Sequence, residues 1–166
     1  MGTCWPPVAL ARVLALAVPA ALLGGAYLGQ YAFDLYPCEM CWWQRYPHFA
    51  AVGLAGMGLI ARPARLWLGL AALAILSSGL IGAFHAGVEY GWWQGLTACS
   101  NPVSGGGDPL EAVLNAPLVR CDEVQWSLFG ISLAGWNFLI STSAALVIFR
   151  LLFRREASAR PTEAFS

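Results

Sequence analysis

Two cysteines separated by two residues stand immediately before a long apolar stretch. Cys38 and Cys41 enclose Glu39 and Met40, and Arg45 follows one helical turn after the second cysteine. A C-x-x-C pair can close a small, reducible disulfide, and a thiolate near a helix N-terminus or a cation has a lowered pKa. This arrangement predicts thiol redox chemistry at the start of a helix.

The same spacing also occurs in zinc sites and in c-type haem attachment sites. Haem attachment requires a histidine directly after the second cysteine, and Trp42 occupies that position. The spacing also permits a zinc site, because Cys99 and Cys121 could supply two further ligands. These two cysteines do not themselves form a C-x-x-C pair. We favour redox chemistry and expect no metal at these residues.

The composition is that of a membrane protein. Of the 166 residues, 58% are hydrophobic and only 11% are charged, whereas about a quarter of the residues in a soluble domain are charged. The chain has no lysine, and its nine arginines are balanced by nine acidic residues. This balance gives no indication of nucleic-acid binding, and we expect none.

Four apolar stretches approach the length of about 20 residues that a membrane-spanning helix needs. They cover residues 8–28, 43–60, 66–88 and 126–149. The first is too long, and has too few basic residues before it, for a cleaved signal peptide. The short connection between the second and third predicts an antiparallel hairpin. We expect an all-α membrane protein, a four-transmembrane-helix bundle that forms a single domain over residues 1–166.

The arginines predict how the bundle is oriented, because cytoplasmic flanks and short loops carry an excess of positive charge. One side of the bundle would carry Arg12, Arg62, Arg65, Arg150, Arg154, Arg155 and Arg160. Only Arg45 and Arg120 lie on the other side. Both termini and the tail 150–166 are therefore expected in the cytoplasm, and the loops 29–42 and 89–125 on the outer side.

The five cysteines divide in the same way. Cys38, Cys41, Cys99 and Cys121 fall in or beside the two outer loops, and Cys4 lies on the opposite side. Lasting disulfides belong to oxidising compartments such as the periplasm. We expect two periplasmic cysteine pairs and a spare Cys4 without a role.

The second outer loop contains a helix-start pattern. Asp108 suits an N-cap, Pro109 the first helical position, and Glu111 the acidic third position. We expect a short amphipathic helix here that ends before Pro117 and lies on the membrane surface.

Two cysteine pairs on one face of a membrane suggest a relay by thiol–disulfide exchange, whose electrons need an acceptor. The chain has neither a dinucleotide-binding fingerprint nor a haem motif. An acceptor dissolved in the bilayer, a quinone near Cys41 and Arg45, satisfies this requirement.

The chain resembles the bacterial disulfide bond formation protein B (DsbB) family. The resemblance extends over almost the whole chain, and its most specific parts are the 38–41 motif with Arg45, the pair Cys99 and Cys121, and residues 126–137. It implies a multi-pass protein of the bacterial inner membrane that reoxidises a periplasmic DsbA-like, thioredoxin-fold oxidase. The implied electron acceptor is a membrane quinone, ubiquinone or menaquinone.

The resemblance also implies a role for each site residue. Cys99 would form the mixed disulfide with the partner, and the released Cys121 would attack the first pair at Cys38. Cys41 would face the quinone as a thiolate, with Arg45 stabilising negative charge there. The family also places a histidine where His85 stands, within reach of the same headgroup. Gln44, where some relatives carry glutamate, is assigned no role.

Two other readings stay open at this point. One is a quinone enzyme similar to the vitamin K epoxide reductases, although those place their quinone-side C-x-x-C towards the end of the bundle. The other is a non-enzymatic membrane protein whose loops are stapled by disulfides or zinc. Disulfides or zinc that only hold the loops together would not require Arg45 close to the first cysteine pair.

Overall fold

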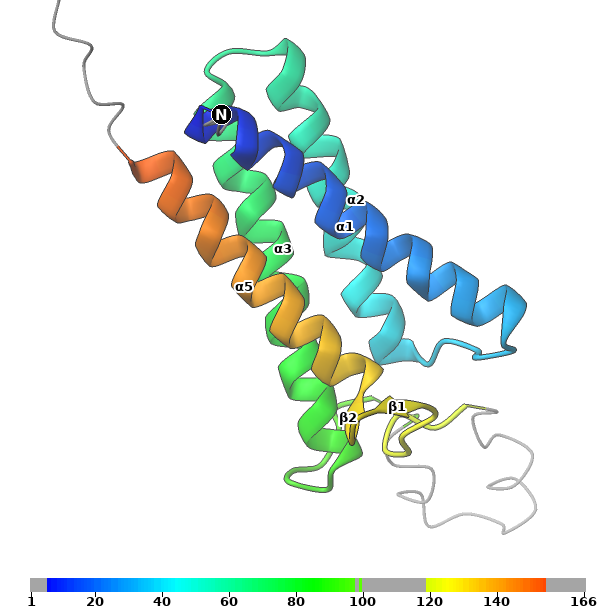
Figure 1. Cartoon of the computed structure of the whole chain (residues 1–166). Coiled ribbons are helices and arrows are strands. Elements are labelled where there is room, and N and C mark those ends of the chain that lie inside the picture. Colours follow the sequence, from blue (N-terminus) through cyan, green and yellow to red (C-terminus); the bar gives the residue numbers. More distant parts are fainter. Residues whose placement is uncertain (1–5, 98, 100–118, 155–166) are drawn as a thin grey trace, which may run out of the picture.

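The computed structural model describes residues 6–97, 99 and 119–154. In these residues four helices pack lengthwise into a bundle, and two short strands form a hairpin (Figure 1). The helices are α1 (Pro7–Ala32), α2 (Glu39–Ile60), α3 (Ala64–Glu89) and α5 (Leu133–Phe153). The start of α2 and the hairpin lie at one end of the bundle, and the N-terminus and the end of α5 lie at the other (Figure 1).

The expected all-α bundle is confirmed. Among the described helices, α1, α3 and α5 are long and apolar enough to cross a membrane. The helix α2 has 22 residues, about the length of α5, but carries polar residues along its first half, so its crossing stays a prediction. Cys4 and the surface helix expected after Asp108 lie outside the described residues.

The helix α2 begins at Glu39, earlier than the expected start at residue 43. Cys38 is its N-cap residue, with extended backbone, and the Cys38 Sγ accepts a hydrogen bond of 3.3 Å from the Cys41 amide. A side chain that accepts from an amide of the first turn fixes the start of a helix. The C-x-x-C motif itself therefore forms the N-terminal cap and first turn of α2.

The last span begins later than expected, so the predicted start at residue 126 is wrong. Strands β1 (Ser127–Leu128) and β2 (Ile131–Ser132) pair antiparallel ahead of α5. Phe129 and Gly130 form the two-residue turn between them, with φ values of 54° and 77°. Two consecutive residues with positive φ match the turn that joins tightly paired strands, and Ser132 then caps α5 by accepting from the Gly135 amide.

The interior of the bundle contains many small residues. Alanines from all four helices pack with Leu68, Ile75 and Ile148 at the end away from the cysteines. Large apolar side chains such as Leu80 and Leu146 are exposed on the outside of the helices. An apolar exterior around a tightly packed interior is the arrangement that a lipid environment favours.

Two glycines let α3 and α5 approach closely. A Cβ atom at Gly82 would lie 2.8 Å from the carbonyl oxygen of Ala134, and one at Gly79 would lie 2.8 Å from the Thr142 hydroxyl. Small residues at a helix interface allow the backbones of membrane helices to approach closely. The approach places the first turns of α5 against the polar part of α3.

We predict that Gly82→Ala lowers the thermal midpoint of the detergent-purified protein. The new Cβ would press on a backbone oxygen that cannot rotate away, at a cost of about 1–3 kcal/mol. Gly69→Ala is the matched control, because Gly69 lies on the same helix with no atom within 4 Å of its would-be Cβ. Equal midpoints for the two variants would contradict the close packing of α3 and α5.

Candidate active site

The first cysteine pair is reduced and its two sulfur atoms are in contact. The Cys38 thiol donates to the Cys41 Sγ over 2.9 Å. This hydrogen bond, together with burial, raises the pKa of the Cys38 thiol well above its usual value. Cys38 therefore keeps its proton and donates it in a hydrogen bond to the Cys41 Sγ, which stabilises a thiolate at Cys41.

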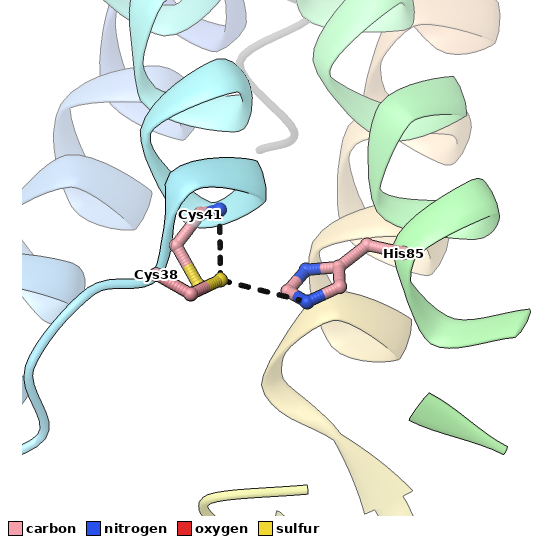
Figure 2. Close-up of side chains that lie close together, drawn as sticks. All are labelled: Cys38, Cys41 and His85. Carbon is pink, nitrogen blue, oxygen red and sulfur yellow. Dashed lines mark hydrogen bonds between the residues drawn. The ribbon is translucent and has the colours of Figure 1, made fainter. Parts of the chain in front are cut away.

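His85 reaches the same pair from α3. Figure 2 shows its ring pointing towards Cys38, with the Nε2 atom 3.6 Å from the Cys38 Sγ. The same Nε2 lies 3.2 Å from the carbonyl oxygen of Cys121 and 3.9 Å from a carboxylate oxygen of Glu89. One ring nitrogen thus touches the segments that carry both cysteine pairs.

Gln44 determines which nitrogen of His85 carries the proton. The Gln44 Oε1 accepts from the Asn137 amide over 2.8 Å, and the Gln44 Nε2 donates to the Met40 carbonyl over 3.2 Å. The same Nε2 donates to the His85 Nδ1 over 2.9 Å. An Nδ1 atom that accepts leaves the proton on Nε2, so His85 presents an N–H to Cys38 and Cys121.

The second pair forms a disulfide between Cys99 and Cys121. Both residues are buried, and they pack with Cys38, Met40 and Val88 in one apolar cluster. The Thr97 hydroxyl contacts the Cys99 Sγ at 3.0 Å. The two pairs are therefore packed together within one cluster. The second pair is oxidised and the first pair is reduced.

Arg45 lies beside the first pair but turns towards α1. Its guanidinium donates to the Gln30 Oε1 over 2.7 Å and to the Ala26 carbonyl over 3.2 Å. It also lies over the rings of Tyr27 and Trp42, each centroid 4.9 Å away. These contacts hold a buried cation at a fixed position one helical turn from Cys41.

A cavity of about 740 Å³ opens beside these residues. Its polar lining includes Cys38, Cys41, Gln44, Arg45, His48, His85, Glu89 and Asn137. Most of the remaining lining is apolar and comes from α1, the segment before α2, and α5. Its volume lies within the range of about 300–1,000 Å³ that is typical of small-molecule sites.

A metal could also be held at part of this site. The ligand atoms of Cys38, Cys41 and His85 lie within 4.8 Å of one another, whereas a structural zinc ion takes four ligands. Cys99 and Cys121 are bonded to each other and offer no thiolate. The four-cysteine zinc site considered from the sequence is therefore not formed in this structure.

Comparisons with known proteins agree with the resemblance. The family model described as "Disulfide bond formation protein DsbB" matches residues 9–151. The chain belongs to the DsbB family. "Disulfide bond formation protein B" of Verminephrobacter eiseniae is 34% identical, over 93% of this chain and 90% of that protein. The proteins of the same name from Paracidovorax citrulli and an Azoarcus species are 32% and 35% identical, covering 96% and 82% of this chain and 97% and 87% of those proteins. No solved structure matches the chain.

In this DsbB-family chain, the six residues expected to form the site lie in the cysteine cluster or along the adjoining cavity: Cys38, Cys41, Arg45, His85, Cys99 and Cys121. The structure also adds a polar network that we did not predict, made of Gln44, His48, Ser78, Asn137 and Ser141. The spacing of Gln44 and His48, four residues apart before a long apolar stretch, was a signal for it. Polar residues inside membrane helices face the bundle interior or a cavity and are functional candidates.

We predict that iodoacetamide modifies Cys41 before Cys38 in the reduced protein. Cys38 is buried and keeps its proton, since the pKa of its thiol is raised. In Cys38→Ala, Cys41 loses the S–H donor that lowers the pKa of its thiol, so the midpoint of its alkylation should move to higher pH. Mass spectrometry of samples labelled across a pH series measures both effects at each cysteine.

The control for this experiment is Cys4→Ala, which should leave the Cys41 profile unchanged. Faster labelling of Cys38 would contradict the assigned hydrogen-bond direction. An unmoved Cys41 profile in Cys38→Ala would show that the thiol contact does not stabilise the Cys41 thiolate.

Proposed function

We propose that this DsbB-family chain is a thiol:quinone oxidoreductase that reoxidises a DsbA-like periplasmic oxidase and passes the electrons to a membrane quinone. The observation that carries the proposal is the position of His85, whose Nε2 contacts both Cys38 and the Cys121 segment. This contact places the two cysteine pairs side by side, as exchange between them requires.

The relay begins at the second pair. A thiolate of the reduced partner attacks the Cys99 Sγ, the Cys99–Cys121 bond breaks, and Cys121 leaves as a thiolate. The second thiolate of the partner then attacks the partner's sulfur in the mixed disulfide, which closes the partner's disulfide and frees Cys99. The partner leaves oxidised, and two electrons remain on Cys99 and Cys121.

The exchange between the pairs follows the same chemistry. The Cys121 thiolate attacks the Cys38 Sγ of an oxidised first pair and releases Cys41 as a thiolate. Cys99 then attacks Cys121, which re-forms the Cys99–Cys121 disulfide and releases Cys38. The His85 Nε2–H lies 3.6 Å from the Cys38 Sγ and stabilises this leaving thiolate. The outcome is the oxidation pattern of this structure.

The residues around the cavity fit a quinone. An apolar lining suits a ring and an isoprenoid tail, and the fixed cation Arg45 lies beside Cys41 at the polar end. A bound quinone would be the acceptor for two electrons and two protons. Cys38 and Cys41 would give up the two electrons as their disulfide forms; the Cys38 thiol would supply one proton, and solvent would return the proton that Cys41 loses when it ionises. Arg45 would stabilise the Cys41 thiolate before it reacts.

The proposed topology is a multi-pass protein of the bacterial inner membrane with four spans. Both termini would lie in the cytoplasm and both cysteine-bearing segments in the periplasm. The arginine distribution supports this orientation. The start of α2 and the hairpin, which flank the cysteine pairs, also lie at one end of the bundle (Figure 1).

We predict that the purified full-length protein consumes quinone when a reduced thioredoxin-fold oxidase is the electron donor. Cys41→Ala and Cys99→Ala should each abolish turnover, because each removes one thiol that the relay requires. Cys4→Ala should retain wild-type activity. Quinone absorbance measures the rate.

A wild-type protein that leaves the quinone unchanged while its cysteines stay oxidised would contradict the proposal. The cysteine pairs would then form structural disulfides that only hold the loops together. Turnover that survives Cys99→Ala with the protein donor would instead show that the second pair is not the entry point for electrons.

A further inference from the structure

Thr97 places a hydroxyl group against the second cysteine pair. Its Oγ1 lies 3.0 Å from the Cys99 Sγ and 3.7 Å from the Cys121 Sγ. Thr97 is buried, with 6% of its surface exposed, and both cysteines are buried as well. One hydroxyl group is therefore within hydrogen-bonding reach of both sulfur atoms of the Cys99–Cys121 disulfide.

The chemistry of the disulfide determines the direction of this contact. Neither sulfur atom of a disulfide carries a hydrogen atom, so each can only accept, and the Thr97 hydroxyl is the donor. A hydrogen bond to a neutral sulfur is weak, whereas a bond to an ionised acceptor is roughly twice as strong as a neutral one. The contact therefore becomes stronger when the disulfide opens and a thiolate forms.

The surroundings of the second pair make such a donor valuable. The other members of its cluster are the first cysteine pair and a set of apolar side chains, those of Met40, Phe84, Val88 and Val119. The Nε2–H of His85 is directed at the carbonyl oxygen of Cys121, and this contact leaves the sulfur to Thr97. A thiolate that forms in an apolar cluster loses hydration, which is costly unless a donor within the protein replaces it.

We propose that Thr97 is a catalytic residue of the second pair, whose hydroxyl stabilises the thiolates that form when the Cys99–Cys121 disulfide opens. This inference rests on the proposed function and adds a residue to the step in which electrons enter the protein. The hydroxyl donates a hydrogen bond and keeps its proton throughout.

Two sulfur atoms leave as thiolates during electron entry. When a partner thiolate attacks the Cys99 Sγ, the Cys99–Cys121 bond breaks and Cys121 leaves with the electron pair, 3.7 Å from the Thr97 hydroxyl. When the partner closes its own disulfide, Cys99 leaves in turn, 3.0 Å from the same hydroxyl. Two electrons pass from the partner to the pair. The hydrogen bond favours the reduced pair and therefore raises its reduction potential.

The test isolates the second pair in the full-length protein in detergent. Cys4, Cys38 and Cys41 are each replaced by alanine, so that Cys99 and Cys121 are the remaining cysteines. The pair is equilibrated with mixtures of reduced and oxidised glutathione. Labelling with a maleimide-linked polyethylene glycol then gives the reduced fraction as a gel shift. This measurement requires neither a quinone nor the partner protein.

Thr97→Val and Thr97→Ser separate the hydroxyl from the shape of the side chain. Valine keeps the shape and removes the hydroxyl, whereas serine keeps the hydroxyl. We expect Thr97→Val to lower the equilibrium constant for reduction of the pair about tenfold, which corresponds to a reduction potential lower by about 30 mV. Thr97→Ser should stay within about threefold of the parent value.

Thr142→Val is the matched control. It also removes a threonine hydroxyl that is buried, and this hydroxyl has no hydrogen-bond partner among the residues that the structure describes. Thr142 lies on α5, where its hydroxyl faces Gly79 of α3. The equilibrium constant of the second pair should therefore be the same in Thr142→Val as in the parent.

A second measurement connects the equilibrium to the relay. With a reduced thioredoxin-fold oxidase as the donor, the rate at which the second pair is reduced should fall several-fold in Thr97→Val and recover in Thr97→Ser. A parent pair that this oxidase does not reduce would contradict the proposed function, and the catalytic role of Thr97 with it.

Three results would overturn the inference and leave the proposed function standing. If Thr97→Val and the parent have equal constants, the hydroxyl does not stabilise the thiolates. If Thr97→Ser falls as far as Thr97→Val, packing around the side chain sets the potential and the hydroxyl does not. If Thr142→Val causes the same change, the effect does not come from contact with the sulfur atoms.

Discussion

The contact of one imidazole with two parts of the chain organises this site. The Nε2 of His85 lies 3.6 Å from the Cys38 Sγ and 3.2 Å from the Cys121 carbonyl oxygen, while its Nδ1 accepts from Gln44. Inside an apolar bundle, polar groups must find their partners within the protein. The first turn of α2, the end of α3 and the segment before the hairpin are therefore tied together, and this brings the two cysteine pairs into one cluster.

The same requirement extends into the bundle. Asn137 at the start of α5 bonds to Gln44 and His48 on α2 and to Ser78 on α3. These bonds need close helix packing, which Gly82 permits because it carries no side chain. The hydrogen bonds that join α2, α3 and α5 also set the tautomers of His48 and His85. The packing of the helices therefore affects the groups beside the redox site.

The sequence predicted the parts of this site that depend on local chemistry. The C-x-x-C pair at a helix start and the apolar stretches were read from neighbouring residues, and the structure confirms the first and three helices that are long and apolar enough to cross a membrane. The resemblance rested on motifs spread along the chain, and the comparisons confirm the family. Gln44 received no role and His48 was not considered, because one of the main partners of each is Asn137, 93 and 89 residues further along the chain. The hairpin at 127–132 was missed because its apolar residues read as the start of the last helix.

The most direct test of this account is to map disulfides in a variant that carries both Cys41→Ala and Cys99→Ala. Cys38 and Cys121 then lack their usual partners, and the account predicts that mild oxidation joins them in one disulfide, found by mass spectrometry of the digested protein. A variant in which both remain free thiols under conditions that oxidise the wild type would contradict the claim that the two pairs exchange directly beside His85.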